Sequence, residues 1–138
     1  MITNSSVGYS GTPLWKKLGF KPSMRIAVRN PPSHYADLLA DGPNDWHIIR
    51  SAKNADAIHL FIINPADTAD IIKLAAHLPP AKMLWVSWPK KTSPLSRALS
   101  EDDIRKAALA CGLVDVKVCA VDADWSGLKL MRRKTQPL

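Results

Sequence analysis

The chain has 138 residues, of which 46% are hydrophobic, so we expect a folded domain with a real core and exclude a disordered chain. Its net charge of +7 favours anionic partners, although solubility alone explains that charge equally well. No apolar run approaches the ~20 residues that span a bilayer, no signal peptide is recognisable, and Cys111 and Cys119 suit buried apolar positions. These features favour the reducing cytoplasm and exclude a membrane partner.

The first part of the chain predicts a short helix and then a strand. We expect residues 1–11, which are polar and rich in glycine and serine, to be flexible. Thr12 is placed to N-cap a short helix that ends before Gly19. Residues 24–28 predict a strand, which ends at the sequence Arg-Asn-Pro-Pro over 29–32 because proline has no N–H for a strand ladder.

Two further strands are predicted before the middle of the chain. A short helix over 33–39 leads to a strand over 46–49, and a strongly apolar strand over 57–63 follows. Only residues 51–56 connect these two strands, whereas a parallel crossover usually takes a dozen residues or more. Two alternatives therefore stay open: the strand over 46–49 is antiparallel, or it lies at an irregular edge of the sheet.

The second half of the chain alternates helices and strands most clearly. Capping residues and stop signals predict a helix over 64–78, a strand over 83–88, a helix over 100–111, a strand over 116–120 and a final strand over 128–132. We expect the final strand to be antiparallel to its predecessor and residues 133–138 to be flexible. The strand over 83–88 is apolar on both faces, which is typical of a parallel sheet covered by helices on both sides.

This alternation predicts an α/β fold in a single domain over residues 1–138. We expect a three-layer, Rossmann-like architecture with a mainly parallel sheet and a C-terminal antiparallel hairpin strand.

Three motifs stand out along the chain. They are Gly8-Tyr9-Ser10-Gly11-Thr12-Pro13-Leu14 with Lys16-Lys17-Leu18-Gly19, then Trp85-Val86-Ser87-Trp88-Pro89-Lys90-Lys91, and Asp124-Trp125-Ser126-Gly127-Leu128-Lys129. Together they resemble a family of small bacterial proteins defined as a domain of unknown function. The resemblance covers most of the chain and implies no activity, because the family has no established one.

The order of elements from Ala57 onward is also similar to the second half of a class I methyltransferase-like Rossmann fold, which ends in an antiparallel hairpin strand. That resemblance implies a glycine-rich turn after the first strand, where backbone N–H groups approach the cofactor. This chain has Arg-Asn-Pro-Pro at 29–32 instead, and its two prolines have no N–H. We therefore expect no cofactor in that pocket.

Polar and aromatic side chains follow the predicted strands at one edge of the sheet. Ligands of parallel sheets bind beyond the carboxyl ends of the strands. The candidates at those ends are Asn30, Trp88, Lys90, Lys91, Asp122, Trp125 and Ser126. They predict a cleft for an anionic or planar ligand, in which lysine supplies charge and tryptophan a stacking surface. The alternative is a solvated loop with two packed tryptophans.

The two tryptophans of the strand over 83–88 are expected to differ in exposure. Trp85 and Trp88 are three positions apart, so their side chains point to opposite faces of the strand. We expect Trp85 in the core and Trp88 at the surface.

A weaker anion site is predicted at Thr12, with Lys16 and Lys17, because the free N–H groups of a helix start bind phosphate. An ordinary cap on an amphipathic helix explains the same residues. Asp122 and Asp124 fit a turn better than an acid/base pair.

No catalytic or metal-binding set is predicted. The four histidines, at 34, 47, 59 and 77, lack the spacing of metal ligands, and no serine lies in a G-x-S-x-G sequence. His59 lies inside an apolar strand and is the one histidine worth testing, with a core histidine bonded to a neighbour as the alternative.

The sequence therefore favours a small cytoplasmic binding module whose partner is an anionic small molecule or an acidic protein. Two alternatives stay open: a divergent methyltransferase-like enzyme without the glycine-rich cofactor loop, and a weak nucleic-acid binder that carries no recognised nucleic-acid-binding motif.

Overall fold

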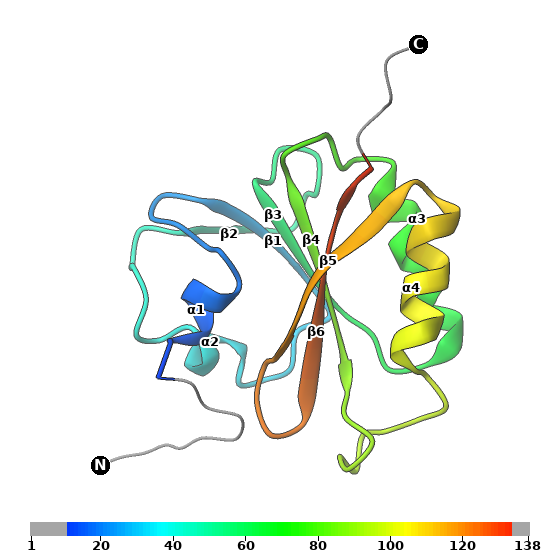
Figure 1. Ribbon diagram of the computed structural model, residues 1–138. Helices are drawn as coiled ribbons and strands as arrows, with labels where there is room; N and C mark the ends of the chain where they lie inside the picture. The colour runs from blue at the N-terminus through cyan, green and yellow to red at the C-terminus, as the bar shows by residue number, and fades with distance from the viewer. Residues whose placement is uncertain (1–10, 134–138) are drawn as a thin grey trace.

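The computed structural model describes residues 11–133 and has three layers (Figure 1). A six-stranded sheet is the middle layer. The helices α1 (Leu14–Lys17) and α2 (Tyr35–Leu38) cover one face, and the 3-10 helix η1 (Pro65–Thr68), α3 (Ala69–Ala75) and α4 (Glu101–Ala110) cover the other. In this part of the chain, no helix has the length and apolar character needed to cross a membrane.

The sheet has the strand order β2-β1-β3-β4-β6-β5. Its strands are β1 (Arg25–Arg29), β2 (His47–Ile49), β3 (Ala57–Phe61), β4 (Met83–Pro89), β5 (Leu113–Ala120) and β6 (Trp125–Arg132). Strands β1 to β4 are parallel, whereas β6 is antiparallel to both β4 and β5. The predicted Rossmann-like α/β fold with a C-terminal antiparallel hairpin strand is confirmed.

Strand β2 is a parallel strand at the edge of the sheet, so the antiparallel alternative is wrong. It has three residues and pairs only with the start of β1, from Arg25 to Ala27. Strand β3 begins opposite Ile26. The end of β2 and the start of β3 therefore lie at nearly the same height along β1, on its two sides. The connection between them has only to cross β1, so a short loop is long enough, whereas full-length parallel strands need a crossover helix.

The first helix is shorter than predicted. It begins at Leu14 with Pro13 as its N-cap, so the prediction that Thr12 caps it is wrong. The helix has four residues and ends before Gly19, whose backbone adopts a left-handed φ of 77°. Its position is set by the sheet, because the indole N–H of Trp85 donates to the carbonyl of Leu18 over 2.8 Å.

Helix α4 forms as its sequence predicts. The backbone N–H of Ser100 donates to the Asp103 carboxylate over 3.0 Å, and the N–H of Asp103 donates to the Ser100 hydroxyl over 3.3 Å. This capping box satisfies two backbone groups at the helix start. Gly112, with a φ of 85°, follows the helix and turns the chain into β5.

The core consists of one hydrophobic cluster on each face of the sheet. Trp85 is fully buried in the cluster under α1 and α2, and Trp88 lies in the cluster under α3 and α4. The prediction that they point to opposite faces is confirmed. The prediction that Trp88 lies at the surface is wrong, because its side chain is only 7% exposed.

Candidate functional site

A hollow of about 400 Å³ lies at the carboxyl end of β4 and is called here the β4 hollow. It is lined by Trp88, Pro89, Lys90, Lys91, Leu99, Ser100, Glu101, Asp102 and Ser126. The segment that follows β4 and the start of α4 meet there, at the lower end of the sheet in Figure 1. The structure thus brings together four of the seven residues predicted for the cleft: Trp88, Lys90, Lys91 and Ser126.

The apolar wall of the β4 hollow comes from residues that also belong to the core. Trp88 and Leu99 are each 7% exposed and pack in the cluster under α4. Ser126 pairs with Trp88 across β6 and β4, so both side chains lie on the same face of the sheet. A ligand in this hollow would therefore meet the accessible part of an indole next to a hydroxyl.

Two lysines supply positive charge at the rim of the β4 hollow. The backbone N–H of Lys90 donates to the carbonyl of Asp124 over 2.8 Å, which fixes the chain as it leaves β4. The Lys90 side chain is half-buried and the Lys91 side chain is exposed. Within residues 11–133, neither lysine takes part in an ion pair.

The same hollow has an acidic side, formed by Glu101 and Asp102 in the first turn of α4. Asp102 pairs with Arg105 over 3.0 Å, and Glu101 also pairs with Arg105. Arg105 further contacts Asp115 over 3.1 Å. These carboxylates are thus partly neutralised by their own arginine. The chain order could have located these acids near the lysines, because a helix that follows a parallel strand begins at that strand's carboxyl end.

Trp125 does not line the β4 hollow. The final strand was predicted to begin at residue 128, but β6 already begins at Trp125, which pairs with Pro89. Its side chain is therefore directed to the face opposite Trp88. It is 3% exposed and packs edge-on against Phe61, with ring centroids 5.0 Å apart. The stacking role predicted for Trp125 is wrong in this conformation.

Asp122 forms the predicted turn and also makes a contact that the sequence did not indicate. One carboxylate oxygen accepts the N–H groups of Asp124 and Trp125, each over 2.8 Å. The other oxygen lies 2.8 Å from Nε2 of His34. This pair joins segments 88 residues apart and is partly open to solvent. No spacing rule within the sequence could have found it.

Asn30 lies elsewhere on the same edge of the sheet, beside two further hollows that are called here the β1 hollows. One, of about 490 Å³, is lined by Val28, Arg29, Asn30, Pro31 and Arg50. The other, of about 240 Å³, is lined by Arg29, Asn30, Leu60, Asp70, Lys73 and Leu74. Arg29 and Asn30 belong to both, and neither hollow contains a lining residue of the β4 hollow.

The residues of the weaker predicted anion site, Thr12, Lys16 and Lys17, lie in and just before α1. Thr12 is exposed and precedes the N-cap. The ammonium of Lys16 lies 5.4 Å from the centre of the Trp15 ring. The carbonyl of Lys17 accepts a hydrogen bond from the Lys117 ammonium over 3.1 Å. Anion binding at these residues stays a prediction.

His59 is fully buried in the middle of β3 and bonded to two hydroxyl groups. Its Nδ1 lies 3.0 Å from the Tyr35 hydroxyl and its Nε2 lies 2.8 Å from the Ser87 hydroxyl. Burial lowers the pKa of His59 from 6.5 to about 3 and raises the pKa of Tyr35 above its usual range. The alternative of a core histidine bonded to its neighbours is confirmed.

The two cysteines are free thiols, and burial raises the pKa of each. Within the described range, no group of three or more His, Cys, Asp and Glu side chains is arranged to hold a metal ion.

Comparisons with known proteins concern the fold only. Neither a protein-family model nor a curated protein sequence matches the chain. A SAM dependent methyltransferase from Aquifex aeolicus superposes with a TM-score of 0.61 at 13% identity, over 86% of this chain and 87% of that one. Magnesium protoporphyrin IX methyltransferase from Synechocystis PCC 6803, solved with bound SAM, gives 0.54 at 12% identity, over 86% and 74%. A protein of the NADB-Rossmann superfamily from Streptococcus agalactiae gives 0.54 at 15% identity, over 94% and 72%.

At these low identities the similarity establishes a Rossmann-like, methyltransferase-like fold and no activity. The analogy to the methyltransferase fold is therefore confirmed at the level of architecture. The resemblance to the bacterial family of unknown function stays a prediction.

Proposed function

We propose that this protein is a small binding module that holds an aromatic anion in the β4 hollow. The observation that carries the proposal is the position of an indole wall, Trp88, next to Lys90 and Lys91 in one hollow at the carboxyl edge of the sheet. Ligands of α/β sheets bind at that edge. Small-molecule sites typically combine apolar walls with a few polar groups that orient the ligand.

The chemistry of the hollow favours a carboxylate or phosphate attached to a planar ring. The ring would pack on Trp88 and Leu99, where contact with water is already low. The anionic group would lie toward the two lysines, whose ammonium groups act as point charges. Because Arg105 pairs with Glu101 and Asp102, the two acids oppose an anion less than free carboxylates would.

The experiment is NMR titration of the isotope-labelled protein with a series of aromatic carboxylates, benzoate among them. Binding in the β4 hollow should shift the Trp88 indole and Ser126 amide signals. In the variant Lys90→Ala/Lys91→Ala we expect the affinity to fall at least tenfold. The matched control is Lys21→Ala/Lys106→Ala, which removes two exposed lysines outside the hollow. Equal affinity in the two double variants would overturn the proposal.

A methyltransferase-like enzyme is the second candidate, favoured by the fold similarity. The residues after β1 do not fit the cofactor. A nucleoside cofactor needs glycine and free N–H groups in this turn, but Pro31 and Pro32 have no N–H. Arg50 directly follows β2, near where dinucleotide folds place an acidic residue for the ribose hydroxyls. We therefore derive no transfer step.

Calorimetry with S-adenosylmethionine tests this second candidate. Because the turn after β1 has two prolines and no glycine, we expect no heat of binding at millimolar cofactor. Saturable binding would support the enzyme hypothesis and would mean that the cofactor binds without the usual contacts to this turn.

We further propose that the protein acts in the cytoplasm, because its two cysteines are unpaired and a reducing compartment keeps them so.

A further inference from the structure

The crevice between the carboxyl ends of β1 and β3 carries a cluster of basic side chains that the β4 hollow does not use. We propose that this crevice binds the phosphate group of a small phosphomonoester through Arg29, Asn30 and Lys73, with Arg50 at its rim. The proposal is independent of the aromatic anion assigned to the β4 hollow, because the two sites share no lining residue.

The topology places a ligand site in this crevice. In the order β2-β1-β3, the strand that follows β1 in the chain lies on one side of it and β3 lies on the other. The connection that leaves β1 leads to β2, whereas the connection that leaves β3 leads through α3 to β4 on the opposite side, so the two connections diverge. Open α/β sheets bind ligands at such a switch point. The smaller β1 hollow, lined by Leu60 of β3 and Lys73 of α3, opens there, and the larger one adjoins it on the side of β2, where Arg50 lines it.

Arg29 is held in position by the neighbouring strand. Its Nε donates to the carbonyl of Arg50 over 3.0 Å. This bond fixes the plane of the guanidinium and leaves its two terminal amino groups without an ion-pair partner among residues 11–133. A guanidinium with two free amino groups binds two oxygens of one phosphate at once. Arg29 is therefore the central residue of the proposed site.

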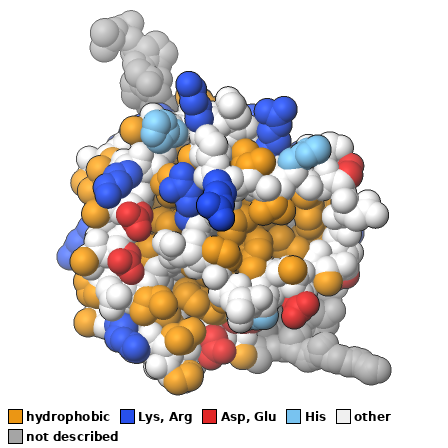
Figure 2. All heavy atoms as spheres, turned by 180° about the vertical axis from the view of Figure 1, so that it is seen from behind, with side chains coloured by type: hydrophobic (Ala, Val, Ile, Leu, Met, Phe, Trp, Pro, Cys, Tyr) orange, Lys and Arg blue, Asp and Glu red, His pale blue; other side chains and the backbone are white. Residues whose placement is uncertain are grey.

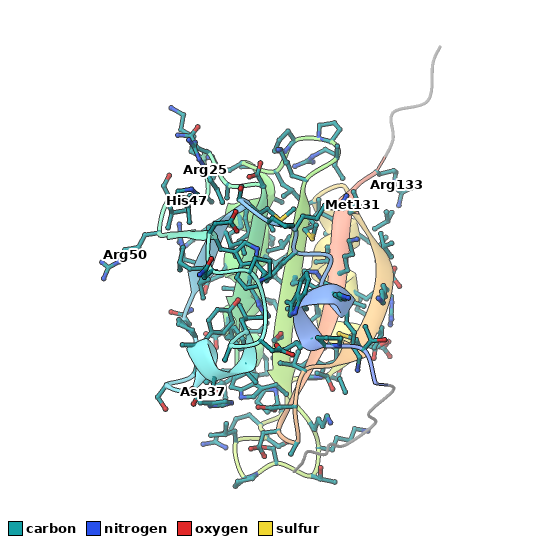
Figure 3. The ribbon with its side chains drawn as sticks, turned by 90° about the vertical axis from the view of Figure 1, so that its left-hand side faces the viewer. Arg25, Asp37, His47, Arg50, Met131 and Arg133 are labelled. Atoms are coloured by element: carbon teal, nitrogen blue, oxygen red, sulfur yellow. The ribbon has the colours of Figure 1, made fainter. Side chains whose placement is uncertain are left out.

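Two further cations and one acid set the charge of the crevice. Lys73 lies on α3, on the far wall from Arg29, and Asp70 lies one turn before it. Arg50 lines the larger β1 hollow, and its side chain extends outward from the β2 edge (Figure 3). Counting Arg29, Arg50 and Lys73 against Asp70, the crevice carries a formal charge of +2. A phosphomonoester carries between about −1.5 and −2 at neutral pH, so the charges match.

The β2 edge lies behind the sheet in Figure 1 and faces the viewer in Figure 2, where Lys and Arg side chains near the centre of the face lie beside acidic side chains and a broad hydrophobic area. Asn30 adds a neutral donor at the mouth of the crevice. Its φ of 56° holds its backbone in a left-handed conformation that asparagine tolerates, and its amide lies 3.5 Å from the carbonyl of Phe61. A long bond of this kind leaves the amide available to a ligand.

The experiment is calorimetry and NMR titration with two probes, inorganic phosphate and ribose 5-phosphate. We expect both to shift the Asn30 signals. In the variant Arg29→Ala/Lys73→Ala the affinity for both probes should fall at least tenfold. In Arg29→Lys it should fall severalfold, because lysine keeps the positive charge but cannot bind the phosphate in a bidentate manner. The control Lys53→Ala/Arg97→Ala removes two exposed cations elsewhere and should bind as the wild type does. Circular dichroism checks that each variant is folded.

Three results would overturn the proposal: no binding of either probe at millimolar concentration, binding that survives Arg29→Ala/Lys73→Ala, or tighter binding of a single-stranded oligonucleotide without a terminal phosphate than of ribose 5-phosphate. The variant Lys90→Ala/Lys91→Ala should leave phosphate binding unchanged, whereas Arg29→Ala/Lys73→Ala should leave aromatic carboxylate binding unchanged. Failure at one site is therefore distinguishable from failure at the other.

Discussion

Replacing His59 by glutamine should remove most of the acid sensitivity of this fold. His59 is completely buried between two uncharged hydroxyl groups, and burial lowers its pKa to about 3. In the unfolded chain the same imidazole has its ordinary pKa of 6.5. Between these two values the unfolded chain binds one proton more than the folded protein. Stability therefore decreases as the pH falls from 6.5 toward 3.

The size of the effect follows from the two pKa values. One extra bound proton changes the free energy of unfolding by about 1.4 kcal/mol for each pH unit. Over the whole interval the loss is about 5 kcal/mol, which is comparable to the total stability of many small domains. The carboxylates of Asp45, Asp56 and Asp115 have pKa values lowered from 3.8, so they add their own loss only below about pH 5, where the unfolded chain begins to protonate them. The interval from pH 5 to 6 thus isolates the histidine.

Urea unfolding followed by tryptophan fluorescence at half-unit steps from pH 4.5 to 7.5 measures this slope. We expect a slope near 1.3 kcal/mol per pH unit at pH 5 in the wild type, on the order given by a single proton. His59→Gln should be less stable at neutral pH but nearly flat from pH 5 to 6. The control His77→Gln changes an exposed histidine and should keep the wild-type slope. Equal slopes in wild type and His59→Gln would refute the reasoning.

Two further substitutions test the packing that positions the site. Ser100→Ala removes the hydroxyl that accepts the Asp103 N–H, and should lower the free energy of unfolding by about 1 kcal/mol in denaturant titration; no change would mean that the capping box contributes nothing. Gly127→Ala places a Cβ 3.2 Å from the Trp85 ring and 3.3 Å from Val121, and should destabilise by about 1–3 kcal/mol because the Trp85 indole is fixed by its bond to Leu18. The surface substitution Val118→Thr serves as the reference for both and should stay within about 0.5 kcal/mol of the wild type.

Four of the predicted cleft residues lie together, and their grouping follows from the direction of the parallel strands. Lys90, Lys91 and Ser126 meet Trp88 because β4 ends where β6 begins, and antiparallel pairing then places them at one edge. The position of Trp125 could not be predicted, because it depends on the residue at which β6 starts to pair. A shift of the strand start from 128 to 125 moved this side chain from a turn into the core.

The basic crevice beside β1 was even less accessible to sequence reasoning. Asn30 was predicted to line the cleft together with Trp88 and the two lysines, Arg29 was seen only as a residue that ends a strand, and Lys73 was not singled out. What joins them is the insertion of β1 between β2 and β3, which brings α3 next to the end of β1. The contact between His34 and Asp122 has the same origin in pairing across the molecule.

The sequence by itself determined the alternation of strands and helices, the capping box at Ser100, the turn at Asp122 and the burial of Trp85, because hydrophobic periodicity and local hydrogen bonding act over a few residues. Only the tertiary structure decided the parallel orientation of β2, the burial of Trp88 and Trp125, and the separation of the edge into the β4 hollow and the β1 hollows. The physical reason is that strand order and register join segments far apart in the chain, and a change in register by one residue exchanges the two faces of a strand.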